Sequence, residues 1–175
     1  MHTSTLIMLL AMFSAPLCAS LGHTSIVMTG TVLQESCDIS TDSKNQTVTI
    51  GSFSAAEFKS VGSVTTAVPF NIQLSKCSPN VSSAGVTFNG TQFGSDPTQL
   101  ALTDTSGSGD LAVGVVVQVL DNNGPIALNS VNATRYALHA SGNNKLPFSL
   151  RYQATQIPVK PGNGSAVLYF SMDYQ

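Results

Sequence analysis

Apolar and polar residues alternate with a period of two in several short segments of the chain. This pattern is typical of β-strands with one buried face. It is clearest in residues 69–74 (PFNIQL) and 148–154 (FSLRYQA), and residues 47–50 and 86–88 are shorter candidates. Residues 112–120 (AVGVVVQVL) are apolar on both faces, which predicts a central strand covered on both sides.

Turn-forming residues separate these segments. Combinations of Gly, Asn and Pro that favour turns occur at residues 89–90, 121–125, 142–144 and 161–164. Only residues 55–59 (AAEFK) have a helical pattern, and it is long enough for about one turn. Several short strands with turns between them predict an all-β fold, an antiparallel sandwich of the immunoglobulin type.

The first residues carry the pattern of an export signal. Residues 6–13 (LIMLLAMF) are continuously apolar, and small residues follow, among them Ala15 and Ala19. The apolar run is too short to span a bilayer and is typical of a signal peptide. We expect a signal peptide over residues 1–21, cleaved between residues 19 and 23, although its start contains no Lys or Arg. The alternative is a buried N-terminal strand or helix.

The cysteines also indicate export. Three cysteines are present, and Cys18 lies within the expected signal peptide. Its removal leaves Cys37 and Cys77, an even pair in an oxidising compartment, which favours a disulfide. Such a bridge would stabilise the fold by roughly 4 kcal/mol in the chain-entropy model. The alternative is two buried free thiols.

The charge of the chain excludes one class of partner. Charged residues make up only 9% of the 175 residues, and the formal net charge is −2. Phosphate contacts need clustered Lys and Arg, so a nucleic-acid-binding face is excluded.

Groups that could perform catalysis or hold a metal are scarce. The histidines are His2, His23 and His139, and no H-E-x-x-H, G-x-S-x-G or P-loop motif occurs. Asp104 and Asp110 flank a Gly/Ser loop, but a calcium site needs more oxygen ligands, so a solvated loop is favoured. We therefore expect no enzyme activity, no cofactor, no metal and no small-molecule substrate.

Both ends of the exported chain carry alternating apolar rows. Residues 166–175 (AVLYFSMDYQ) have a strand pattern whose apolar row is Leu168, Phe170, Met172 and Tyr174. A segment behind the signal peptide places on one face Thr24, Ile26, Met28, Gly30 and Val32. Since chain ends normally fray, a terminal strand this apolar must lie in a sheet. The simplest interpretation of the N-terminal segment is the first strand of the same sandwich.

Taken together, these features resemble the chaperone–usher pilins. The resemblance rests on the signal peptide, the cysteine pair, the alternating N-terminal segment and a terminal strand with a penultimate Tyr174. It is most evident in residues 68–77 (VPFNIQLSKC) and 154–175, and Gly162 stands fourteenth from the end, where these pilins keep a glycine. The chain is most similar to a minor tip subunit of type 1 fimbriae. Residues 25–30 (SIVMTG) resemble the donor segment of that subunit.

This resemblance implies an incomplete immunoglobulin-like sandwich that lacks its last strand. Residues 35–175 would form the pilin domain, and residues 22–34 would be a donor-strand extension that enters the next subunit. The inserted side would consist of Thr24, Ile26, Met28, Gly30 and Val32. The receiving and chaperone-facing region would contain Gly162, Leu168, Phe170, Met172 and Tyr174, the last of which would help to seat the chaperone.

The resemblance also implies partners, location and function. The partners would be neighbouring fimbrial subunits, a periplasmic chaperone and an outer-membrane usher, and the protein would pass through the periplasm to a surface fimbria. We expect a structural adaptor subunit that supports cell adhesion. One alternative is a major rod pilin. Another is a secreted immunoglobulin-like binding module, suggested by N-x-[ST] sequons at Asn45, Asn80, Asn89, Asn132 and Asn163. A tip adhesin is disfavoured by the length, since adhesins of this family carry an additional lectin domain.

Overall fold

The structure of the chain is a computed structural model that describes residue 29 and residues 36–140 and 142–175. These described residues form eight strands, a short α-helix and a 3-10 helix. In chain order, the elements are β1 (Asp38–Ile39), α1 (Thr41–Lys44), η1 (Ala55–Glu57), β2 (Val68–Ser75), β3 (Ser83–Asn89), β4 (Val115–Asp121), β5 (Gly124–Pro125), β6 (Thr134–Ala137), β7 (Asn144–Ala154) and β8 (Tyr169–Tyr174). Neither helix in this part of the chain has the length and apolar composition needed to cross a membrane.

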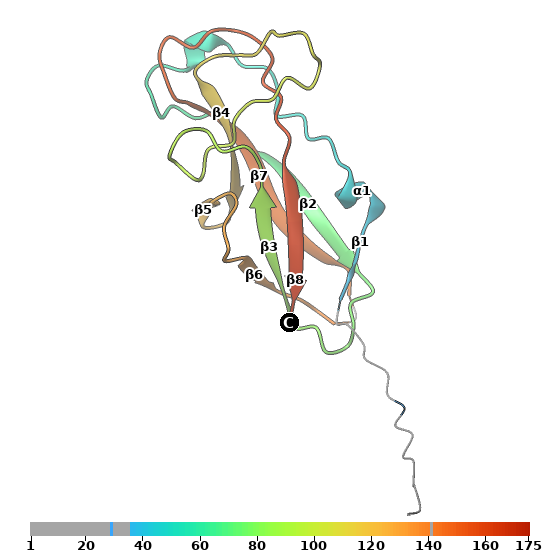
Figure 1. Cartoon of the computed structure of the whole chain (residues 1–175). Helices are drawn as coiled ribbons and strands as arrows, with labels where there is room; N and C mark the ends of the chain where they lie inside the picture. The colour runs from blue at the N-terminus through green and yellow to red at the C-terminus, as the bar shows by residue number, and fades with distance from the viewer. Residues whose placement is uncertain (1–28, 30–35, 141) are drawn as a thin grey trace, which may run out of the picture. The chain divides into compact units, whose positions relative to one another are not determined.

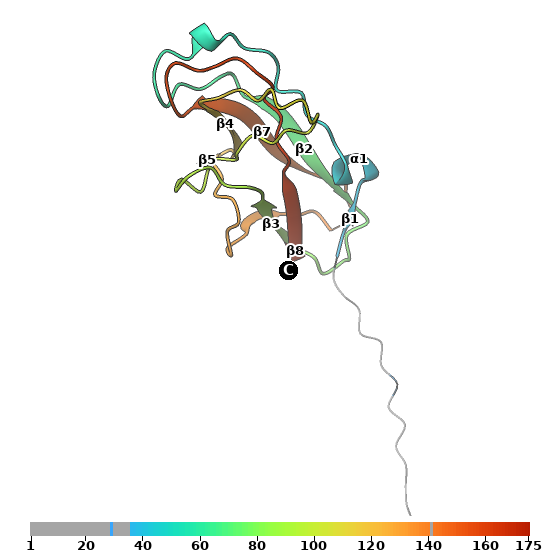
Figure 2. The same cartoon turned by 45° about the horizontal axis from the view of Figure 1, so that its top comes forward.

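The strands form two antiparallel sheets. The larger sheet has the strand order β1-β2-β7-β4-β5, and the smaller sheet has the order β6-β3-β8. Figures 1 and 2 show the two sheets as separate layers, with β3 and β8 on one side and β2, β7 and β4 on the other. The predicted all-β sandwich is therefore confirmed.

The hydrophobic core lies between the two sheets. In the larger sheet, Ile72 pairs with Leu146 and Phe70 pairs with Phe148. The Phe148 ring meets Phe88 of β3 edge-on, with ring centroids 4.9 Å apart. Phe88 and Phe148 are 1% and 3% exposed. Because these side chains come from both sheets, their burial holds the sheets together.

One disulfide fastens the β1 edge of the larger sheet. Cys37, which precedes β1, is bonded to Cys77, which follows β2, with an S–S distance of 2.08 Å. Asn144 donates a hydrogen bond from Nδ2 to the Cys77 sulfur over 3.6 Å. The structure therefore contains the bridge rather than two free thiols.

Most of the predicted elements are confirmed. The strands β2, β3, β4 and β7 cover the segments in which alternation or a continuous apolar run predicted them, and the helical pattern forms the single turn η1. The strand predicted from residue 112 begins later, at Val115. The reason is Gly114, whose φ of +90° interrupts extended backbone.

The prediction of a strand over residues 47–50 was wrong. Ile50 packs against the core, as its alternation required. However, these residues are irregular, and no strand of the described chain pairs with them. A strand needs backbone partners as well as a suitable pattern of side chains.

Candidate functional site

In the described part of the chain, the last strand, β8 (red in Figure 1), has a neighbouring strand on one side only. Its partner is β3, with pairs that run from Ala84–Tyr174 to Asn89–Tyr169. Across residues 36–140 and 142–175, no strand pairs with the other edge of β8. Such an edge presents backbone N–H and C=O groups that can template a further strand. The predicted terminal strand is thus an edge strand, and it begins at Tyr169 rather than at residue 166.

The alternation of the ladder identifies the backbone groups on the open edge. Gln175 and Ser83 exchange both of their backbone hydrogen bonds, each 3.0 Å long. Hydrogen-bonded and non-bonded pairs alternate in an antiparallel ladder. In the register of β3 and β8, the bonded positions on β8 are therefore Tyr169, Ser171 and Asp173. The backbone groups that point to the open edge are those of Phe170, Met172 and Tyr174.

The side chains of the same segment divide between two faces. Tyr169, Ser171 and Asp173 are exposed. The inward row packs against the core and consists of Leu168, Phe170, Met172 and Tyr174. All four inward side chains stay only half-buried. The structure therefore gathers the predicted apolar row on one face, beside an edge where a further strand would cover it.

The C-terminal end of β8 is fixed next to the disulfide. Tyr174 donates a hydrogen bond from its hydroxyl to the carbonyl of Cys37 over 3.4 Å. Partial burial is the main cause that raises the pKa of Tyr174, so the hydroxyl stays protonated and able to donate. The Gln175 carbonyl accepts backbone hydrogen bonds from Ser82 and Ser83. This end of the edge strand is therefore attached both to the residue before β1 and to the start of β3.

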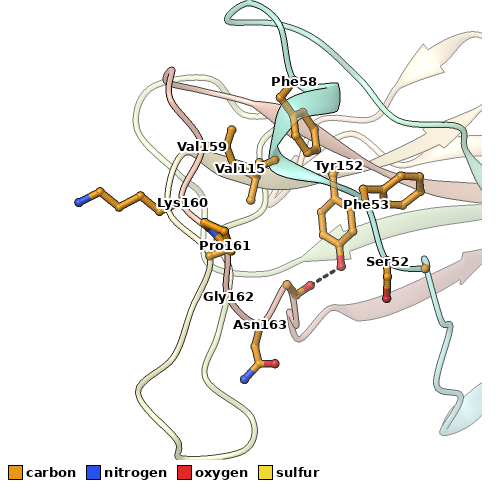
Figure 3. Close-up of a pocket in the computed structure, with 14 residues that line it drawn as sticks. Ser52, Phe53, Phe58, Val115, Tyr152, Val159, Lys160, Pro161, Gly162 and Asn163 are labelled. Carbon is orange, nitrogen blue, oxygen red and sulfur yellow. Dashed lines mark hydrogen bonds between the residues drawn. The ribbon is translucent and has the colours of Figure 1, made fainter.

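A cavity of about 270 Å³ lies where the chain approaches the other end of β8. Figure 3 shows Phe58, Val115 and Tyr152 converging on it, whereas the side chain of Lys160 points away. Tyr152 donates a 2.7 Å hydrogen bond to the carbonyl of Gly164, drawn as a dashed line. Burial raises the pKa of Tyr152, which keeps the hydroxyl a donor. This bond ties the segment that leads into β8 to the larger sheet.

Sequence reasoning did not identify this cavity. Phe53 and Phe58 come from the segment around η1, Tyr152 comes from β7, and Val159 precedes β8 by ten residues. Their side chains meet only in the folded chain. The aromatic character of Phe53 and Phe58, in a region with few other apolar residues, was the only available signal.

The structure places Gly162 outside β8, in the segment that leads to it. A Cβ at this position would overlap the backbone nitrogen of Ala112 and lie 2.6 Å from the carbonyl oxygen of Leu111. Ala112 also donates a backbone hydrogen bond of 3.0 Å to Asn163. Glycine is required here because two backbone segments touch, which leaves no room for a side chain.

The predicted donor residues lie outside the residues that the structure describes. They are Thr24, Ile26, Met28, Gly30 and Val32. Their insertion into another subunit therefore stays a prediction.

The remaining candidate groups within the described residues are Asp104, Asp110 and His139. In the described part of the chain, no group of three or more His, Cys, Asp or Glu side chains is placed to hold a metal ion. The Asp104 carboxylate accepts backbone hydrogen bonds from Gly109 at 2.6 Å and Gly107 at 2.7 Å. The bond from Gly109 is the main cause that lowers the pKa of Asp104. His139 lies between β6 and β7, and its backbone N–H donates to the Asn144 side chain over 2.8 Å.

Comparison with known proteins gives consistent matches over nearly the whole chain. The family model described as "Fimbrial protein" matches residues 26–175. The chain is 38% identical over 148 residues to the uncharacterised fimbrial-like protein YcbU of Escherichia coli K12, a match that covers 83% of this chain and 81% of the relative. It is 33% identical over 180 residues to the type 1 fimbrial subunit of Salmonella typhimurium, which covers 99% of this chain and 97% of the relative.

Solved structures are also similar. The P pilus rod subunit PapA superposes with a TM-score of 0.67 at 20% identity, over 79% of this chain and 99% of that chain. At this identity, the similarity supports the fold alone. A type I fimbria protein and antigen of Burkholderia pseudomallei superposes with a TM-score of 0.58 at 33% identity, over 79% of this chain and 88% of that chain.

Proposed function

The chain belongs to the fimbrial protein family, and from this premise we propose that it is an adaptor subunit joined to its neighbours by donor-strand exchange. As a family member it is an exported structural protein, not an enzyme, and it assembles with other pilin subunits into surface fimbriae. This membership replaces the alternative of a secreted binding module. The mode of joining and the place in the fimbria are the proposed parts.

The open edge of β8 is the observation that carries the proposal. It offers the backbone groups of Phe170, Met172 and Tyr174 to an incoming strand. The half-buried row beside them offers apolar contacts. Strand addition combines these two contributions, since main-chain hydrogen bonds supply affinity and alternate side chains supply specificity.

We assign the incoming strand to residues 22–34 of a neighbouring copy or related subunit. Burial of Ile26, Met28 and Val32 would contribute about 1.5–3 kcal/mol each. Gly30 would lie where the receiving surface leaves no room for a side chain. Residues 1–21 would be removed as the signal peptide, and residues 35–175 would form the receiving domain. N-terminal sequencing of the exported protein checks this division.

The same open edge supports a periplasmic chaperone as a further partner. An unpaired edge beside half-buried apolar side chains promotes aggregation. A chaperone that lends a strand would cover the edge until an outer-membrane usher brings the next subunit. Tyr174, fixed at the end of β8, would lie where the chaperone is seated.

The experiment that tests strand exchange adds a synthetic peptide of residues 22–35 to the exported subunit and follows amide hydrogen exchange. We expect new protection at Phe170, Met172 and Tyr174, whose N–H groups point to the open edge. Ser171 and Asp173, already paired with β3, should change little. A scrambled peptide of the same composition is the control. A stable monomer whose open-edge amides ignore the peptide would refute the proposal.

A major rod pilin is the second candidate, since the Salmonella type 1 fimbrial subunit matches 99% of this chain. The two candidates differ in copy number and position. Quantitative mass spectrometry of purified fimbriae, with immunogold labelling, should find an adaptor in few copies near the tip. Labelling along the whole shaft would establish the rod subunit instead.

A further inference from the structure

An ion pair crosses the outer face of the smaller sheet, from the edge strand β6 to the edge strand β8. The register places Arg135 of β6 and Asp173 of β8 opposite the same residue of β3, Gly85. Arg135 Nη2 is paired with Asp173 Oδ2 above this central residue. The neighbours Ala84 and Val86 point into the core, so the pair lies on the outer face. Two strand spacings, about 10 Å in all, separate β6 from β8, and a long Arg side chain can span them.

Gly85 provides the room for this contact. Its φ is not in the left-handed region, so its backbone does not require glycine. A Cβ at residue 85 would overlap the Asp173 carboxylate and lie 2.7 Å from the Ala133 Cβ. Glycine normally weakens a strand interior, so its presence here needs a local reason. Passage of the ion pair over the strand supplies that reason.

We infer that Arg135 and Asp173 are positioning residues that hold β8 in register on β3 while its other edge is open. This inference rests on the proposed strand exchange. A strand with two neighbours is aligned from both sides, whereas β8 has only β3 beside it in residues 36–140 and 142–175. The ion pair adds a second attachment that reaches β6. It acts near the end of β8, whose backbone at Asp173 is in a position bonded to β3.

The effect should be moderate and local. The two side chains are 37% and 52% exposed, so water and salt weaken their attraction. Exposed ion pairs typically change local equilibria by about 1.5- to 5-fold. The other ion pair of the described chain, between Lys76 and Asp38, is more exposed. Because Asp38 lies close enough to Tyr174 of β8 to influence its hydroxyl, this pair is unsuitable as the control.

Amide hydrogen exchange in the exported subunit, kept dilute and without peptide, tests the inference. Arg135→Gln and Asp173→Asn should each accelerate exchange at Ser171 and Asp173 about 1.5- to 5-fold, with the amides of β7 unchanged. The double variant should exchange no faster than either single variant, because both changes remove one interaction. Gly85→Ala should have the same effect. Lys59→Gln removes an exposed charge outside the smaller sheet and should leave β8 unaffected.

Three outcomes would overturn the inference. They are unchanged exchange at Ser171 and Asp173, equal acceleration throughout β7, and additive effects in the double variant. Peptide capture supplies a second readout, since both charge variants should bind the peptide of residues 22–35 more slowly by a similar factor. If the unmodified subunit captures no peptide, the proposed strand exchange fails, while the exchange data still decide whether the ion pair holds β8.

Discussion

β4 and β8 are both apolar strands, but only β4 is surrounded. β4 pairs with β7 on one side and with β5 on the other, and Leu100 forms a further bridge to Val117. Every residue from Val115 to Leu120 is buried. Among the strands that the structure describes, β8 pairs with β3 alone, and none of its residues is fully buried.

The difference separates two contributions that usually coincide. Side-chain burial drives a strand into the core, and backbone pairing fixes its place in a sheet. In β4 both contributions are complete within the chain. In β8 each is about half complete within the described chain, so a further strand at its open edge would add to both.

The largest expected effect comes from placing a charge in the inward row of β8. Phe170→Asp should lower the affinity for the peptide of residues 22–35 by more than about a thousandfold, because covering an unpaired carboxylate costs several kcal/mol. Isothermal titration measures the loss. Ser171→Asp is the matched control, since Ser171 is exposed and lies on the other face. Equal losses for the two variants would show that the inward row does not receive the peptide.

Removal of one aromatic ring from the core between the sheets and one from β8 compares how fully each ring is buried. Phe148→Ala, in the closed core, should lower the free energy of unfolding by about 3–5 kcal/mol. Phe170→Ala should lower it by about 1–2 kcal/mol in the free subunit, since only part of that ring has left water. Chemical denaturation with and without the peptide measures both values. Bound peptide should increase the second loss and leave the first unchanged, and equal losses in the free subunit would contradict the comparison.

Loss of the disulfide should destabilise the β1 edge of the larger sheet. The Cys37–Cys77 bridge joins residues 40 positions apart. Replacing both cysteines with serine should lower the free energy of unfolding by about 4 kcal/mol. Denaturation of the oxidised and substituted proteins measures this change. Mass spectrometry of the exported protein checks the pairing, and two free thiols there would refute it.

Much of the fold could be predicted because alternation reports which face of a strand meets the core. β2 and β7 have one face inward, and β4 has a continuous apolar run because it is covered on both faces. Residues 47–50 show the limit of this reasoning. Their alternation correctly placed Ile50 at the core, but no side-chain pattern tells whether a backbone partner is present.

The site was predicted in part for the same reason. Phe170 and Met172 lie in one local pattern, so the sequence shows that they share a face. The cavity beside Tyr152 and the ion pair of Arg135 with Asp173 depend on register between distant segments. A single sequence does not encode such register in any local pattern. Gly85 was the sign of this ion pair in the sequence, because it is a glycine within an otherwise regular strand.

The smallest expected effect concerns the segment that leads into β8. Tyr152→Phe removes the 2.7 Å hydrogen bond to the Gly164 carbonyl. The free energy of unfolding should fall by about 0.5–1.5 kcal/mol. Tyr169→Phe is the control, because Tyr169 is 68% exposed and its substitution should leave the free energy of unfolding unchanged. Thermal denaturation at neutral pH measures both changes.

The pH dependence identifies the hydroxyl as the cause. Burial raises the pKa of Tyr152 in the folded chain above its value in the unfolded chain, which is about 10. The folded state therefore holds this proton more tightly, so the contribution of Tyr152 is fully present below pH 10 and is lost as the pH rises through the folded pKa. Tyr152→Phe should accordingly lose stability at neutral pH and decline less steeply above pH 10. An unchanged alkaline decline in this variant would show that the Tyr152 hydroxyl is not buried in the folded chain.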